Sequence, residues 1–151
     1  PARDRVLTQD EIETLSEALT EPYRDIFLLM LETGMRCGEV CGIRAEDIHD
    51  KHVTLPNTKN GTVRHVPLST RARELVRPFG VNSQTMSAVF YKARKSVGID
   101  CRLHDTRHTA CTNLARKLSM LELARMLGMR DPRTLMIYYN EGADEIADKL
   151  G

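Results

Sequence analysis

Five side chains in this sequence have the types and order needed to cut a phosphodiester, namely Arg36, Lys59, His104, Arg107 and Tyr138. A phosphodiester attacked by a phenol accumulates negative charge, needs its nucleophile deprotonated and needs its departing sugar oxygen protonated. The four basic side chains and the phenol can cover these three tasks without a metal ion. The sequence therefore predicts metal-free cleavage of DNA by a tyrosine.

The basic residues are suited to different parts of this reaction. A planar guanidinium can hold two phosphate oxygens at once, which an ammonium cannot, so Arg36 and Arg107 are assigned to the phosphate. His104 lies three residues before Arg107, so on a helix both side chains project toward one phosphate. Lys59 is assigned the proton for the departing 5′ oxygen. Glu39, one turn after Arg36, either orients an active-site basic group or forms a plain surface pair with Arg36.

Tyr138 is the predicted nucleophile. Its free phenol has a pKa of about 10, so nearby cations or a base must help it to ionise. Tyr139 is the rival, because neighbouring helical residues point about 100° apart and only one of them can face the site. His108, one turn after His104, is interpreted as a hydrogen-bonded structural histidine.

Capping residues and apolar spacing predict a mainly helical chain. A capping box at Thr8 and Glu11 predicts a helix over about residues 9–20. A second helix follows Pro22 and is stopped by Gly34 before a short helix that carries Arg36, which places Arg36 beside the core. Further helices are predicted at 69–76, 83–96, 104–117, 119–127 and 131–140.

A small sheet interrupts the helices. Residues 52–55 and 62–67 are rich in Val, Thr and Leu and flank Asn60-Gly61, which predicts a β-hairpin with Lys59 at its tip. The predicted fold class is therefore mainly α with a small antiparallel β-sheet (α+β).

Length and composition fit one domain. The 151 residues are 41% hydrophobic and 28% charged, and no apolar run approaches the roughly 20 residues of a membrane span. We therefore expect neither a membrane protein nor a disordered chain. The chain begins Pro-Ala-Arg-Asp, and we expect it to be a piece of a longer protein.

The net charge of +1 hides a strong asymmetry. Residues 1–50 carry 5 Lys and Arg against 12 Asp and Glu, residues 51–140 carry 16 against 5, and residues 141–151 carry 1 against 4. A basic middle with acidic ends predicts DNA binding that weakens steeply as salt rises. The candidate DNA-binding residues in this middle are Arg64, Lys92, Arg94 and Lys95.

Four cysteines are few for this length, so we expect reduced thiols in a cytoplasmic protein. A four-thiolate zinc site is disfavoured because nine residues separate Cys101 from Cys111, rather than two to four. We expect neither a metal nor a cofactor.

Several motifs, taken in order, resemble the tyrosine recombinase (phage integrase) family across nearly the whole chain. They are Thr33-Gly-Met-Arg36-Cys-Gly-Glu39, Thr58-Lys59-Asn-Gly, His104-Asp-Thr-Arg107-His108-Thr, Leu127-Gly-Met129 and Ile137-Tyr138. The resemblance implies that residues 1–151 are a single catalytic domain of the DNA breaking-rejoining type with an acidic tail at 141–151. It also implies that upstream core- and arm-type DNA-binding regions are absent.

The same resemblance implies an activity and partners. Tyr138 would form a 3′-phosphotyrosyl link that stores the energy of the broken bond, so rejoining needs neither metal nor ATP. The implied partners are double-stranded DNA and other recombinase subunits in a tetrameric synapse, with the isolated domain a monomer. The implied location is the cytoplasm of a bacterium, on the nucleoid, with a bacterial or phage gene as the source.

One position departs from the family pattern. Where Leu127-Gly128 is usually followed by histidine or tryptophan, this chain has Met129, a weak acceptor and no donor, which predicts a slower but competent enzyme. The alternatives left open are a DNA-binding module that has lost catalysis and a type IB topoisomerase-like enzyme. A metallohydrolase is disfavoured, because the pair of His104 and His108 lacks the glutamate that serves as base in a helical zinc motif.

Overall fold

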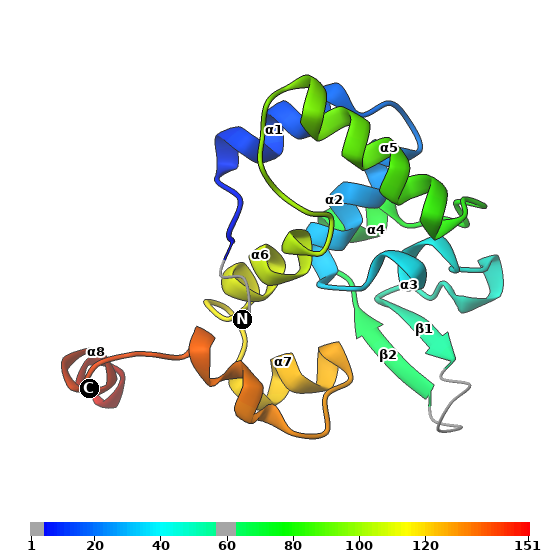
Figure 1. The fold of residues 1–151 in the computed structure, drawn as a ribbon. Coiled ribbons are helices and arrows are strands. Elements are labelled where there is room, and N and C mark those ends of the chain that lie inside the picture. The colour runs from blue at the N-terminus through cyan, green and yellow to red at the C-terminus, as the bar shows by residue number, and fades with distance from the viewer. Residues whose placement is uncertain (1–4, 57–62) are drawn as a thin grey trace.

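The computed structural model describes residues 5–56 and 63–151 and shows a mainly helical chain with a small antiparallel sheet, as predicted (Figure 1). The helices are α1 (Gln9–Ala18), α2 (Tyr23–Thr33), α3 (Cys37–Cys41), α4 (Thr70–Leu75), α5 (Ser83–Ser96), α6 (Asp105–Leu114), α7 (Met120–Leu127) and α8 (Ala143–Leu150). Two 3-10 helices, η1 (Ala45–Asp47) and η2 (Pro132–Tyr138), and strands β1 (His52–Pro56) and β2 (Val63–Pro67) complete the described elements.

Helix α2 forms the centre of the main core. It packs against α1, α3, α4, α5 and α6 and buries Ile26, Phe27, Leu29 and Met30. Phe27 meets Phe90 of α5 with ring centroids 5.6 Å apart. Because these apolar residues recur at three and four, one helix can serve several neighbours, and the site residues on α3 and α6 gain a rigid support.

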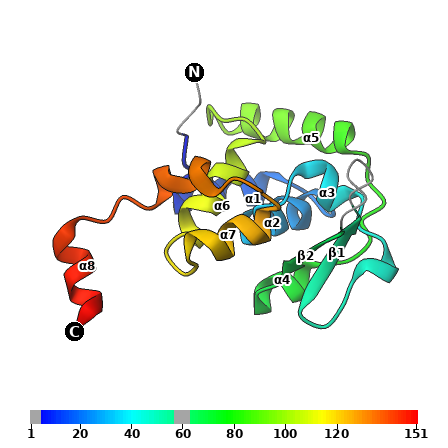
Figure 2. The same cartoon turned by 90° about the horizontal axis from the view of Figure 1, so that it is seen from below.

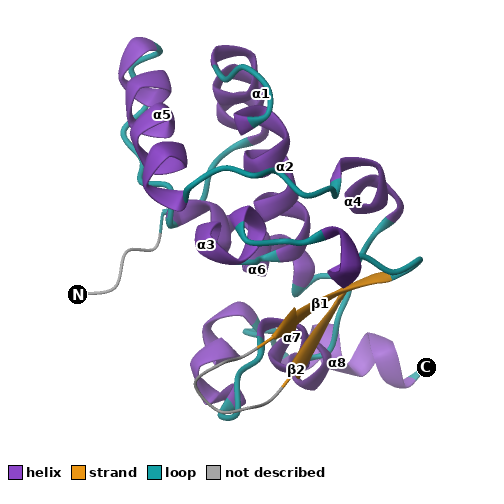
Figure 3. Cartoon of the chain, turned by 90° about the vertical axis from the view of Figure 1, so that its right-hand side faces the viewer, coloured by secondary structure: helices purple, strands orange, loops and turns teal. Residues whose placement is uncertain are grey.

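A second, smaller layer lies below the first. Strands β1 and β2 pair antiparallel, with Thr54 opposite His65, and α7 packs against both β2 and η2 (Figure 3). The buried strand residues Val53, Leu55 and Val66 belong to the main core. A separate buried cluster holds α7 and η2 to α6, and its members are Cys111, Leu123, Ala124, Leu127 and Leu135. The C-terminal end of the site is therefore attached to α6 through its own small core.

The predicted helix ends are confirmed where local chemistry fixes them. Thr8 with Glu11 and Ser119 with Glu122 both form complete capping boxes. Glycine ends α2 and α7 in the left-handed conformation, at Gly34 (φ 71°) and at Gly128 with φ 74°.

Two predicted helical segments differ in the structure. Residues 131–140 were predicted to form an α-helix, but Pro132–Tyr138 form a 3-10 helix. Over seven residues, the sequence pattern does not distinguish 3.0 from 3.6 residues per turn. Arg36 is the N-cap of α3 and is exposed, because the buried residue in this turn is its neighbour Met35. The predicted short helix is present, and Arg36 stands at its N-cap, next to the buried Met35, rather than within it.

The acidic C-terminal segment extends away from the rest of the chain. Helix α8 follows an extended connection and stands apart in both views (Figure 2). Residues 141–151 are all exposed, and Lys149 pairs with Glu141 at 2.6 Å. Within residues 5–56 and 63–151, no helix has both the length and the apolar character needed to cross a bilayer.

Candidate active site

Arg107 is a buried cation with an unmet hydrogen bond. Its side chain projects from α6, and the residue is only 6% exposed. Nη1 donates to the Gly34 carbonyl at 3.0 Å, whereas Nη2 is buried without an acceptor among the described residues. Burial, followed by repulsion from Arg36, lowers the pKa of Arg107. A buried guanidinium nitrogen with no acceptor is costly, so this site is suited to receive an anion.

Glu39 links α3 to the sheet. One carboxylate oxygen accepts the Arg36 backbone N–H at 2.9 Å, and the two oxygens together accept from Arg64 Nη1 at 2.9 Å and Nη2 at 3.1 Å. Burial alone would raise the pKa of Glu39, but the hydrogen bonds from Arg64 and Arg36 outweigh it, and the pKa falls. Glu39 thus holds Arg64 of β2, and its backbone contact fixes the turn that presents Arg36.

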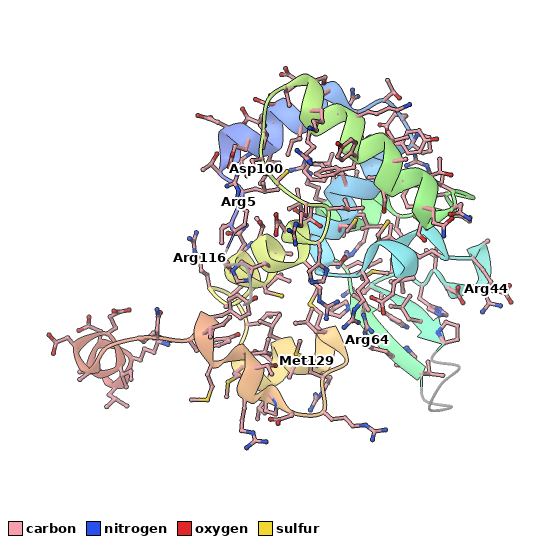
Figure 4. All side chains as sticks on the ribbon, in the orientation of Figure 1. Arg5, Arg44, Arg64, Asp100, Arg116 and Met129 are labelled. Atoms are coloured by element: carbon pink, nitrogen blue, oxygen red, sulfur yellow. The ribbon has the colours of Figure 1, made fainter. Side chains whose placement is uncertain are left out.

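Arg64 also packs against the end of α7. A Cβ added at Gly128 would lie 2.5 Å from Arg64 Cδ and 3.0 Å from Nη1. Arg64 therefore passes across Gly128, the residue before Met129, and its guanidinium reaches Glu39 (Figure 4). Its DNA contact stays a prediction, and the partner that the structure gives it is Glu39. Arg64 Nε is, like Arg107 Nη2, buried without an acceptor among the described residues.

Of the two predicted catalytic residues His104 and Lys59, the described part of the chain includes only His104. His104 is the exposed N-cap residue of α6, and its carbonyl accepts the Arg107 backbone N–H at 3.1 Å. The histidine and the arginine therefore share the first turn of α6, as predicted from their spacing. Lys59 and the predicted turn at Asn60-Gly61 lie outside the described residues.

The hydroxyl of Tyr138 meets the next turn of α6. Its Oη lies 2.6 Å from Nδ1 of His108, and the two rings are 5.2 Å apart between centroids. The Cys111 thiol, three residues after His108, also shares a hydrogen bond with Tyr138. The predicted nucleophile is therefore anchored to the helix that carries His104 and Arg107.

Tyr139 faces elsewhere. Its hydroxyl donates to the Leu118 carbonyl at 2.7 Å, on the loop between α6 and α7. Burial raises the pKa of this phenol. Of the two neighbouring tyrosines, Tyr138 is the one whose oxygen reaches the α6 face occupied by the basic residues.

Sequence reasoning missed three of these contacts. His108 was interpreted as structural, yet it contacts the hydroxyl of the predicted nucleophile, and Cys111 was considered only as a zinc ligand. A signal was present: His104, His108 and Cys111 are spaced by four and three, which places them on one helical face. The pairing of Glu39 with Arg64 had no such signal, because the partners are 25 residues apart on different elements.

Met129 provides no strong hydrogen-bond donor at the position that follows Gly128. Its backbone N–H bonds to the Ala124 carbonyl at 2.8 Å, and its thioether sulfur accepts only a weak contact from the Thr134 hydroxyl at 3.6 Å. The departure from the family pattern at this position thus places a half-buried apolar side chain beside Gly128.

The basic residues of α5 form a separate exposed group. Arg94 and Lys95 both stack on Tyr91, with their cationic atoms 4.8 and 5.4 Å from the ring centroid. Lys92 is exposed on the same helix. These three residues remain predicted DNA contacts.

No cluster of three or more His, Cys, Asp or Glu side chains is placed to share a metal ion in the part of the chain that the structure describes. The four cysteines are free thiols, and Cys37 and Cys41 have their sulfurs 3.9 Å apart. Burial, together with the neighbouring Cys41, raises the pKa of Cys37 to about 12.

Comparison with known proteins identifies the family of this chain. The model of the phage integrase family matches residues 5–80 and 80–145. The chain belongs to the phage integrase family. The shufflon-specific DNA recombinase of Escherichia coli is 36% identical to this integrase-family chain over 165 residues, covering 98% of the chain and 43% of the relative. Tyrosine recombinase XerA of Saccharolobus solfataricus is 29% identical over 164 residues, covering 97% of the chain and 56% of that protein.

Solved structures show the same fold. A lambda integrase dimer bound to a COC′ core site matches with a TM-score of 0.74 at 21% identity, over 91% of this chain and 48% of that one. XerA recombinase matches with a TM-score of 0.70 at 20% identity, over 96% of this chain and 61% of that one. The integrase-family chain spans about half the length of the relatives that it matches in sequence.

Proposed function

We propose that this chain is the catalytic domain of a site-specific DNA recombinase that cuts and rejoins strands through a 3′-phosphotyrosyl intermediate. The observation that carries the proposal is the arrangement on α6. Arg107 presents a buried Nη2 without an acceptor among the described residues, and the Tyr138 hydroxyl contacts the next residue, His108, and Cys111 one turn after Arg107. The cation in need of an anion and the groups that contact the phenol are thus carried by one helix, an arrangement that suits phosphoryl transfer by a tyrosine.

The proposed reaction proceeds by direct displacement at phosphorus. Arg107 and Arg36 bind the non-bridging oxygens of the scissile phosphate and stabilise the charge that grows on them. The Tyr138 oxygen forms a bond to phosphorus while the bond to the 5′ oxygen breaks, and the Tyr138 proton leaves the phenol. Lys59 supplies a proton to the departing 5′ oxygen, and His104 hydrogen-bonds the phosphate from the start of α6. Religation runs these steps in reverse, with a 5′ hydroxyl as the nucleophile.

Double-stranded DNA and further recombinase subunits are the proposed partners. The support comes from relatives whose structures are described as a lambda integrase dimer on a core site and a lambda integrase tetramer bound to a Holliday junction. We propose that the isolated chain is a monomer and assembles only on DNA. Its proposed location is the nucleoid of a bacterial host, with α5 contributing phosphate contacts through Lys92, Arg94 and Lys95.

A covalent-adduct assay tests the proposal. The chain is incubated with nicked duplexes of randomised sequence in the presence of a chelator, and denaturing gels resolve protein-linked strands, which are then sequenced. We expect adducts with the unmodified chain and with Tyr139→Phe, and none with Tyr138→Phe, because only the Tyr138 oxygen faces the α6 site. Strand binding without any adduct would favour a DNA-binding module that has lost catalysis.

The same assay separates recombination from the topoisomerase alternative. Adducts that cluster at one sequence, and that transfer to the 5′ hydroxyl of a second duplex, support a site-specific recombinase. Adducts spread over many unrelated sequences, with relaxation of supercoiled plasmid, would support the type IB topoisomerase alternative instead.

A further inference from the structure

The imidazole of His108 stands outside the five residues assigned to catalysis, yet it touches the atom that would attack phosphorus. Its Nδ1 lies 2.6 Å from the Tyr138 hydroxyl, within the range of about 2.6–3.2 Å expected of a general base and its proton donor. The residue is half-buried and the rings are inclined at 48°, so an edge nitrogen rather than the ring face meets the phenol.

We propose that His108 is the catalytic base that accepts the Tyr138 proton during strand cleavage and returns it during rejoining. The inference rests on the proposed function, since it assigns a role within that reaction. A phenol is in general a much weaker acid than an imidazolium, so it does not give up its proton fully to an imidazole before attack begins. The proton therefore moves while the bond to phosphorus forms, when the phenolic oxygen is losing its negative charge to the phosphate.

The described groups that lie near Tyr138 are poorer proton acceptors than the imidazole of His108. Cys111 also contacts Tyr138, but burial raises the pKa of its thiol, so the sulfur keeps its own proton and is only a weak acceptor for the phenol. Arg107 carries no lone pair for a proton, and His104 lies one turn earlier at the exposed start of α6. The titratable groups on η2 and its caps are Asp131 and Arg133, which pair with each other, Tyr138 itself, and Tyr139, whose hydroxyl donates to the Leu118 carbonyl.

The step balances in atoms and charge. The O–H bond of Tyr138 breaks and its proton binds Nδ1 of His108, which becomes an imidazolium. The phenolic oxygen forms its bond to phosphorus, and the 5′ oxygen leaves with the electron pair of the broken bond and takes a proton from Lys59. In rejoining, the Tyr138 oxygen is the leaving group, and the imidazolium of His108 supplies its proton.

The helix also explains why one residue can serve the nucleophile while its neighbours serve the phosphate. His104 and Arg107 occupy the first turn of α6, and His108 and Cys111 occupy the next, on a continuous face. With a rise of about 1.5 Å per residue, His108 lies roughly 6 Å beyond His104 and about 1.5 Å beyond Arg107 along the helix axis. The spacing of His104 and His108 thus distributes phosphate binding and proton acceptance over one rigid element.

Three variants test this assignment on the preferred site found in the adduct assay. His108→Ala removes the acceptor. In His108→Asn, Oδ1 occupies the place of Nδ1 and still accepts a hydrogen bond, but it cannot take up the proton. His49→Ala removes an exposed histidine on the loop before β1 and serves as the matched control. Circular dichroism and thermal unfolding establish that each variant is folded before its single-turnover cleavage rate is measured.

We expect both His108 variants to cleave about 10²–10⁴-fold more slowly than the unmodified chain, the usual range for loss of a general base, and His49→Ala to be unchanged. Added imidazole should restore part of the rate to His108→Ala in a concentration-dependent way. In a substrate whose 5′ bridging oxygen is replaced by sulfur, the departing 5′ thiolate does not need a proton. This substrate should rescue Lys59→Ala but not His108→Ala, because the two residues act on different protons.

Other outcomes would overturn the inference without touching the proposed function. An unchanged rate in His108→Ala would show that His108 takes no part in cleavage. A faster rate would show that its hydrogen bond to Tyr138 inhibits cleavage. Full activity in His108→Asn would show that His108 only positions Tyr138 through a hydrogen bond. Rescue of His108→Ala by the sulfur substrate would show that His108 acts on the proton of the leaving group instead. If the unmodified chain itself forms no adduct with Tyr138, the proposed function fails first.

Discussion

Gly128 allows a direct test of how the sheet and the C-terminal segment are held together. It adopts φ 74° at the end of α7, and a Cβ added there would lie 2.5 Å from Cδ and 3.2 Å from Nε of Arg64. Gly128→Ala therefore combines a strained backbone with a collision. Since Arg64 cannot retreat without disturbing its paired hydrogen bonds to Glu39, the collision should be felt at the ion pair.

The expected magnitude has two parts. A non-glycine residue in the left-handed region costs about 1–2 kcal/mol. Arg64 and Glu39 are 17% and 24% exposed, so their pair lies between a surface pair, worth up to about 1 kcal/mol, and a buried one, whose disruption costs about 3–5 kcal/mol. We expect Gly128→Ala to lower the free energy of unfolding by about 3 kcal/mol, which corresponds to a fall of about 6–12 °C in Tm at this chain length.

Gly98→Ala is the matched control. Gly98 has nearly the same backbone angle, φ 71°, but nothing lies within 4 Å of the Cβ that would be added. It should show the backbone cost alone, about 1 kcal/mol. Urea unfolding followed by circular dichroism measures both variants, and the difference between them isolates the contact with Arg64.

A double-mutant cycle completes this test. Combining Gly128→Ala with Arg64→Ala should cost clearly less than the sum of the two single variants, because the truncated side chain no longer collides with the new methyl group. If Gly128→Ala proves no more destabilising than Gly98→Ala, or if the cycle is additive, the placement of Arg64 across Gly128 is refuted.

Two further predictions follow from the cap of α1 and from Met129. The hydrogen bonds from Arg5 lower the pKa of Glu11 from 4.5 to about 2, so its contribution is present above pH 4.5 and is lost as pH falls toward 2. Because both side chains are about a quarter exposed, we expect Glu11→Gln to cost about 1 kcal/mol at pH 7 and nearly nothing at pH 2, in urea titrations at both pH values. Met129→His should raise the rate of adduct formation about tenfold by adding a hydrogen-bond donor beside Gly128, and an equal or lower rate would contradict that role.

The elements that depend on local sequence were predicted well. The capping box at Thr8, the left-handed glycines and the strands on either side of residues 57–62 all follow from interactions within a few residues. The 3-10 helix that carries Tyr138 was not predicted, because its tighter winding reflects packing against α7 rather than its own sequence. The exposure of Arg36 was also missed, since a cap residue and a first-turn residue have the same sequence signals.

The amino-acid sequence by itself determined which groups are present and which of them share a helix: the spacing of His104, Arg107, His108 and Cys111 places them on adjoining turns of α6. Only the tertiary structure decided what each of them meets. The Tyr138 hydroxyl contacts His108, which is 30 residues away in the sequence, and Arg107 donates to the Gly34 carbonyl, which is 73 residues away. Helical spacing is set by backbone geometry within a few residues, whereas these contacts are set by how buried surfaces of different elements fit together.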